Sequence, residues 1–117
     1  MSNRYEQPRY EGHEELLAAI RANDVARLRQ AIIAASLYGD DHGAIEKACL
    51  ELSTHEDEIV RGNAVLALGH IARRFSMLSP RGVQVVRDGR QDPSQYVRGQ
   101  AHAAADDVAH FLKIDLG

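Results

Sequence analysis

The sequence predicts an all-α fold, built as a short stack of about three antiparallel helix pairs. Helix-starting and helix-ending residues recur at short intervals along the 117 residues, and only 82–86 resembles a strand. In addition, one segment aligns with a later one at a shift of 37 residues. Self-similarity at a fixed spacing is typical of repeat architectures, in which each helix pair buries its apolar face against the next pair.

The first half of the chain is expected to hold three helices, at 12–21, 24–38 and 42–53. Asp, Asn and Ser side chains at a helix start accept hydrogen bonds from free backbone N–H groups. Such residues gather at three joints: Ala22-Asn23-Asp24, Gly39-Asp40-Asp41 and Ser53-Thr54-His55. Each joint therefore predicts the end of one helix and the start of the next.

Three further helices are expected in the second half, at 57–77, 80–90 and 93–113. The segment 82–86 is rich in Val and could be taken for a strand. Ser79-Pro80 precedes it, and a capping residue followed by proline in the first turn favours a helix start. We therefore expect this segment to be helical.

The clearest internal repeat lies at 55–75 and 91–112. Within it, Val60-Arg61-Gly62-Asn63-Ala64 aligns with Val97-Arg98-Gly99-Gln100-Ala101, and each copy follows an acidic helix start. At these residues the chain resembles the HEAT repeat family, whose second helix commonly opens with Asp-Pro followed by Val-Arg and then small and aliphatic residues. Residues 12–38 could form a third repeat, but the sequence does not show how they would align with the other two.

The resemblance implies one HEAT-like domain over 11–117, wound as a right-handed superhelical α-solenoid. In the family, the second helices line a concave surface that usually holds a partner. Residues 1–10 are polar and are expected to form a disordered arm, because they lack the apolar run of a signal peptide or membrane anchor.

Composition excludes some classes of protein. The net charge of −3 and the pI near 6.0 are unlike a general nucleic-acid binder. Cys49 is the single cysteine, which excludes an intrachain disulfide and favours a reducing, cytoplasmic setting. We expect it to be a buried core thiol. Acids predominate at 40–58 and arginines at 73–98.

Helical spacing predicts which face of 57–77 is buried and which could bind. The core stripe is Val60, Ala64, Ala67, Leu68, Ile71 and Phe75, flanked by Val65 and Ala72. The opposite strip, with its counterparts on the last helix, comprises Asn63, Leu66, His70, Arg73, Arg74, Tyr96, Gln100, Asp107 and Phe111. An ordinary solvated face is the alternative. Apolar side chains at Leu66, Tyr96 and Phe111 favour binding.

Four charged residues of the repeat are interpreted as structural: Asp57, Arg61, Asp92 and Arg98. Asp57 lies one helical turn before Arg61, a spacing that permits an ion pair. In the family, this arginine commonly bonds an acid of the same or the adjacent repeat. Gly62 and Gly99 follow the two arginines, and we expect both to allow close helix packing.

No motif predicts catalysis, and no cofactor is expected. No serine lies in a nucleophile motif, and no glycine-rich phosphate loop is present. His102, Asp106 and His110 recur at four-residue spacing on the last helix, so neighbouring pairs could bind a metal ion. Three ligands on one helix span about 12 Å, so a solvated outer face of the last helix explains them better.

The sequence therefore favours a non-catalytic protein-binding module, for example a small bacterial inhibitor, immunity or adaptor protein. One alternative is nucleic-acid binding through the arginines of 73–98. A second alternative is a lyase-type or metal-dependent enzyme. Self-association as a homodimer, through the outer side of the last helix, is compatible with a protein-binding module.

Overall fold

The computed structural model describes residues 13–117, so the arm expected at 1–10 lies outside the described part. Six α-helices follow in order: α1 Glu14–Ala22, α2 Val25–Tyr38, α3 His42–Leu52, α4 Glu58–Phe75, α5 Pro80–Gly89 and α6 Gln95–Leu112. The all-α prediction is confirmed, and each helix lies within two or three residues of its expected bounds. The segment 82–86 belongs to α5, as Ser79-Pro80 indicated.

Five of the six helices begin with a side-chain cap. In each case a side-chain oxygen accepts a hydrogen bond from the backbone N–H three residues later, which satisfies a donor that the helix itself leaves free. The capping residues of α2 to α6, in order, are Asp24, Asp41, Asp57, Ser79 and Ser94.

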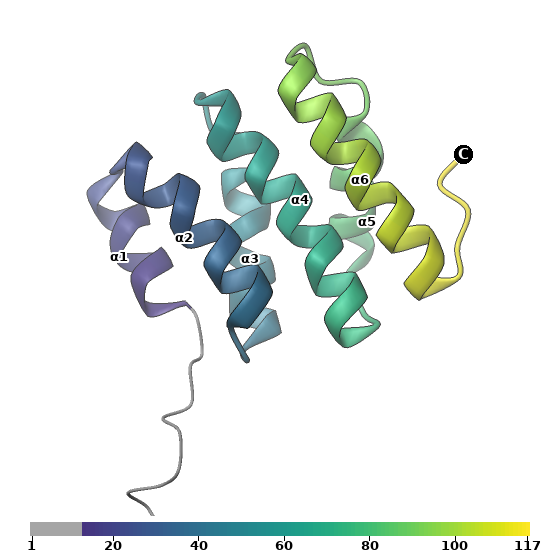
Figure 1. Ribbon diagram of the computed structural model, residues 1–117, viewed down its shortest axis with the longest axis horizontal. Coiled ribbons are helices and arrows are strands. Elements are labelled where there is room, and N and C mark those ends of the chain that lie inside the picture. The colour runs from purple at the N-terminus through teal and green to yellow at the C-terminus, as the bar shows by residue number, and fades with distance from the viewer. Residues whose placement is uncertain (1–12) are drawn as a thin grey trace, which may run out of the picture.

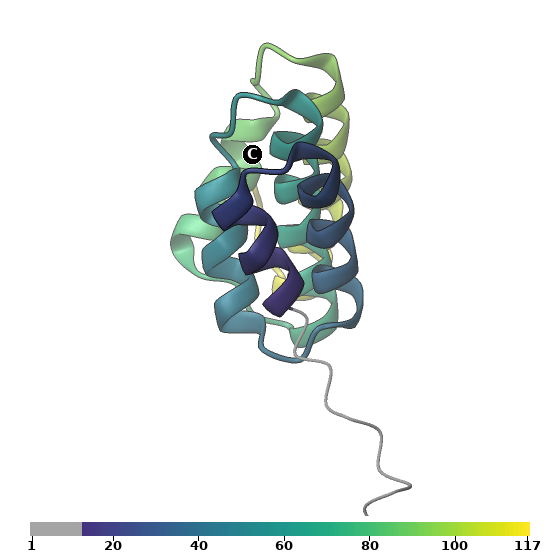
Figure 2. The same cartoon turned by 90° about the vertical axis from the view of Figure 1, so that its left-hand side faces the viewer.

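The helices form two layers (Figure 1). Helices α2, α4 and α6 lie side by side in one layer, and α3 and α5 lie behind them in the other. Figure 2, viewed from the α1 end, shows α1 in front of the two layers as the first member of the stack. The pairs α1–α2, α3–α4 and α5–α6 therefore follow one another along the molecule.

Small residues set the distance between α4 and α6. A Cβ added to Gly69 would lie 2.7 Å from Cα of Ala104, and one added to Gly62 would lie 2.7 Å from the ring of Tyr96. The prediction of close packing is thus confirmed for Gly62. It is wrong for Gly99, which has no heavy atom within 4 Å of an added Cβ. Gly99 lies on the outer side of α6, which no described helix covers.

The capping residues also define the register of the first repeat. Ala31, Ala64 and Ala101 each lie seven residues after the cap of their helix, and all three are buried. Ala34, Ala67 and Ala104 each follow the cap by ten residues. Residues of α2 thus repeat the pattern of α4 and α6, which the self-alignment of the sequence did not reveal.

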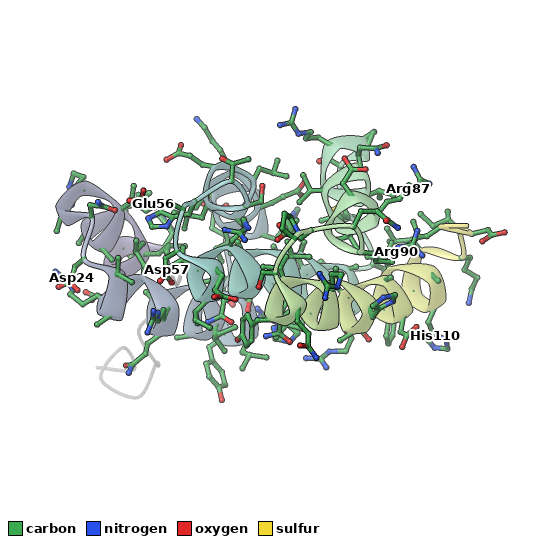
Figure 3. All side chains as sticks on the ribbon, turned by 90° about the horizontal axis from the view of Figure 1, so that it is seen from above. Asp24, Glu56, Asp57, Arg87, Arg90 and His110 are labelled. Atoms are coloured by element: carbon green, nitrogen blue, oxygen red, sulfur yellow. The ribbon has the colours of Figure 1, made fainter. Side chains whose placement is uncertain are left out.

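The C-terminal segment folds back onto the last repeat. Leu116 is buried in the core cluster, and its carbonyl accepts hydrogen bonds from Arg90 Nη2 at 2.8 Å and Arg87 Nε at 3.3 Å. Figure 3 shows both arginines beside this segment. Leu116 therefore packs against the last repeat on the side where its carbonyl meets Arg87 and Arg90.

Candidate functional site

Each repeat contributes one helix to the outer surface of α2, α4 and α6, which we call the even-helix face. Ile33, Leu66 and Ala103 form a row across it, because each lies nine residues after the cap of its helix. Ile33 and Leu66 are half-buried and Ala103 is exposed. The row is apolar in all three repeats, and Ile33 is the member that the sequence interpretation did not identify.

Asn63 joins three helices from within this layer. Its amide nitrogen donates to the carbonyl of Arg29 on α2 at 3.0 Å, and its Oδ1 accepts from Tyr96 Oη on α6 at 2.6 Å. Gln100 Nε2 completes the cluster by donating to Tyr96 Oη at 2.9 Å. Asn63 is only 7% exposed, so the structure places this predicted contact residue between helices, while Tyr96 stays 37% exposed.

His70 connects α4 to α2 through Ser36. The Ser36 Oγ and His70 Nδ1 atoms are 2.9 Å apart, and Ser36 Oγ also donates to the carbonyl of Ile33 at 3.0 Å. Because a hydroxyl carries one proton, Ser36 then accepts from the imidazole ring. Burial, reinforced by the nearby charge of Arg73, lowers the pKa of His70. Ser36 is fully buried, which makes the pair a helix–helix bridge rather than an accessible nucleophile.

Arg74 closes the C-terminal end of α2. Its Nη1 donates to the carbonyls of Ser36 at 3.0 Å and Gly39 at 2.8 Å, and its guanidinium lies 4.6 Å from the ring centroid of Phe75. These carbonyls lack partners within their own helix, so Arg74 satisfies them. Its neighbour Arg73 is exposed.

The residues predicted for partner contact therefore fall into two groups. The first group uses its polar side-chain atoms in hydrogen bonds with neighbouring helices: Asn63, His70, Arg74 and Gln100. The other residues keep surface on the even-helix face: Leu66, Arg73, Tyr96, Asp107 and Phe111. The first group fixes the positions of α2, α4 and α6, and the second group remains on the surface.

Arginine–aspartate pairs connect successive repeats. Arg29 Nη2 donates to Asp57 Oδ1 at 2.8 Å, and Arg61 Nη2 donates to Asp92 Oδ1 at 3.0 Å. In each pair Nε donates to the second carboxylate oxygen, which gives the strong bidentate geometry. The expected pair of Asp57 with Arg61 is not formed, because each arginine reaches the acid of the following repeat instead.

The same pairs shift the acidity of both aspartates. The hydrogen bond from Arg29 lowers the pKa of Asp57 to about 2, and the hydrogen bond from Arg61 lowers the pKa of Asp92. The pKa of each paired arginine is raised by the same hydrogen bond. Asp57, Arg61 and Asp92 thus use their charged groups to join successive repeats, with partners that local spacing could not identify.

The arginines of 73–98 are spread over both layers. Four of them donate to backbone carbonyls: Arg74, Arg87, Arg90 and Arg98. Arg73 lies on α4, whereas Arg81 lies on α5 in the other layer. A phosphate backbone needs a continuous basic surface, and the fold divides this segment between two sides. Nucleic-acid binding through it stays a prediction.

The candidates for chemistry are located as follows. His102, Asp106 and His110 are exposed on α6, and the ring of His110 contacts that of Phe111 at 4.6 Å between centroids. Within 13–117 no three His, Cys, Asp or Glu side chains are placed to hold one metal ion. Cys49 is fully buried, as expected, and burial raises its pKa to about 12.

Comparison with known proteins gives one match. The family model described as HEAT repeats matches residues 13–105, which include α1 to α5 and much of α6. No curated protein and no solved structure matches the chain. Across the described helices, none has both the length and the apolar character needed to cross a membrane.

Proposed function

Because this chain belongs to the HEAT repeat family, we propose that it is a non-catalytic protein-binding module whose contact surface is the even-helix face. HEAT repeats generally act as protein-interaction scaffolds. The observation that carries the proposal is the apolar row of Ile33, Leu66 and Ala103, which crosses all three helices at one register. Tyr96 and Phe111 extend this apolar surface on α6.

The rigidity of the face supports binding. Asn63 and His70 fix α4 against its neighbours through hydrogen bonds to α2 and, for Asn63, to α6. A surface that is already ordered loses less conformational entropy when a partner docks. Arg73 and Asp107 place one charge of each sign beside the apolar row, so a partner that carries apolar residues flanked by both charges would complement it.

A finer proposal is that the partner is a single dedicated protein, as for a small bacterial inhibitor, immunity or adaptor protein. A cytoplasmic setting is consistent with the one buried thiol. A toxin-like reading frame beside the gene would support the immunity role, and its absence would favour an adaptor.

The test is capture of partners from the native host on immobilised protein, in mild salt, with variants as controls. Leu66→Glu should reduce recovery of a specific partner by at least about tenfold, because it places a charge at the centre of the apolar row. Lys47→Gln on α3 changes the net charge by the same single unit on the opposite layer, and it should retain the partner. Equal recovery with both variants would rule out the even-helix face.

A further inference from the structure

The guanidinium group of Arg61 donates hydrogen bonds in two directions. Nη1 points back to its own loop, where it donates to the carbonyls of His55 at 3.0 Å and Glu56 at 3.4 Å. Nε and Nη2 point forward to the carboxylate of Asp92 in the next repeat. One side chain thus fixes its own helix start and binds the following unit.

Arg98 on α6 has the same backward contacts. Its Nη1 donates to the carbonyl of Asp92 at 2.8 Å, six residues earlier, and to that of Pro93 at 3.0 Å, five residues earlier. These are the separations that Arg61 shows. Within residues 13–117, however, no carboxylate contacts the Nε and Nη2 edge of Arg98. In Arg98, the edge that corresponds to the carboxylate-binding edge of Arg61 therefore has no carboxylate partner among the described residues, and the side chain is half-buried.

The opposite end of the stack carries the other half of such a pair. Asp24 caps α2 through a hydrogen bond from the N–H of Arg27, just as Asp57 caps α4 through the N–H of Val60. Asp57 also forms a bidentate ion pair with Arg29, whereas no arginine side chain forms an ion pair with Asp24 among the described residues, although the charge of Arg27 is close enough to interact with it. Figure 3 shows Asp24 at one end of the molecule, far from α6 at the other.

The surface around Asp24 matches an internal junction of the stack. A shallow groove of about 220 Å³ between α1 and α2 is lined by Ala31 and Ala34, with Glu15, Arg27 and Gln30 at its sides. At the corresponding positions of α6, Ala104 packs against Gly69 of the preceding repeat, whereas Ala101 packs against Gly89 of its own helix pair. The groove therefore presents Ala34 at the position where α6 receives a neighbouring repeat inside the molecule.

We infer that copies of this chain stack head to tail, with the outer side of α6 in one copy docked on the α1–α2 groove of the next and Arg98 bound to Asp24. The contact joins two different surfaces, so it can continue to a third copy. On α6, His102 and Asp106 stand where α4 has Val65 and Gly69. These polar side chains make the junction weaker than the internal ones, so association depends on concentration and on salt.

Sedimentation velocity across a concentration series tests this inference on the full chain. The wild-type mass should rise with concentration beyond two copies, and added salt should lower it. Arg98→Gln and Asp24→Asn should each weaken association about tenfold. Asn still caps a helix, so a wild-type melting temperature for Asp24→Asn would separate lost association from lost folding. Arg81→Gln, at an exposed arginine of α5, serves as the matched arginine control and should associate like the wild type.

Mixing the two variants distinguishes stacking from other dimers. Arg98→Gln retains Asp24, and Asp24→Asn retains Arg98, so one intact junction remains possible in the mixture. At concentrations where each variant alone is monomeric, the mixture should form a pair of one copy of each variant and nothing larger. A wild-type chain that stays monomeric near millimolar concentration would overturn the inference. So would single variants that associate like the wild type, or a mixture without the pair.

Discussion

Arg61 binds Asp92 through two parallel hydrogen bonds, from Nε at 2.9 Å and from Nη2 at 3.0 Å, although the two residues belong to different repeats. Both side chains are largely shielded, with 18% and 15% of their surface exposed. The pair therefore connects the second and third repeats at the edge where their helices begin.

Removing this connection should destabilise the whole chain. Arg61→Gln removes a bidentate pair and the bonds to two loop carbonyls, so we expect the free energy of unfolding to fall by about 2 kcal/mol in urea titrations. Arg27→Gln is the control, because the pair of Arg27 with Glu15 is exposed and such pairs contribute little. A loss for Arg27→Gln as large as that for Arg61→Gln would contradict this ranking.

The Asn63 cluster should behave as one coupled unit. Asn63→Ala removes the side-chain donor to the carbonyl of Arg29 and the acceptor of Tyr96 Oη, so we expect a loss of about 2 kcal/mol. Tyr96→Phe removes one hydrogen bond and should cost about 1 kcal/mol. In a double-mutant cycle the two losses should add to more than the double variant shows. Strict additivity would mean that the 2.6 Å contact does not stabilise the fold.

The paired aspartates should make stability fall in acid. The folded-state pKa of Asp57 is about 2, below its ordinary value of 3.8. A carboxyl group with a lowered pKa stabilises the fold above the unfolded pKa and loses that contribution as pH falls toward the folded one. Stability should thus drop between about pH 4 and pH 2. Asp57→Asn should flatten this part of the profile in thermal melts, whereas Asp106→Asn on the exposed side of α6 should leave it unchanged.

Alanine substitutions at Gly69 and Gly99 test the spacing of the helices, because they should change stability in opposite directions. Gly69→Ala forces a methyl group against Ala104 and should destabilise the chain by about 1–3 kcal/mol. The methyl group added by Gly99→Ala meets no atom within 4 Å, so the higher helix propensity of alanine should stabilise the chain by up to about 1 kcal/mol. Chemical denaturation of both variants measures the difference. Equal effects would show that α4 and α6 are not in close contact in solution.

Local signals in the sequence were enough for the helices, because caps such as Asp24, Asp57 and Ser94 act within one turn of the chain. They were not enough for contacts between repeats. Arg29 follows its cap by five residues, whereas Arg61 follows its cap by four, so an alignment of the chain with itself misses the first member of the series. The partner of Arg29 is 28 residues away, a separation set by the packing of α2 on α4.

The sequence predicted which side of α4 holds the candidate site, but not which of its residues stay exposed. Helical spacing places Asn63 and Leu66 on the same side of α4, as the sequence indicated. Spacing within one helix cannot show that α2 and α6 close over Asn63 while they leave Leu66 partly open. That outcome depends on how far apart neighbouring helices lie, which in turn depends on Gly69 and Ala104.

The close approach of Gly69 to Ala104 also has an evolutionary consequence. An added Cβ at position 69 would lie 2.7 Å from the backbone Cα of Ala104, so no substitution at position 104 can make room for it. Across related chains that keep this helix spacing, position 69 should stay glycine, and a larger residue there should coincide with a wider junction. The residue at this position would therefore indicate whether a relative keeps the close α4–α6 approach.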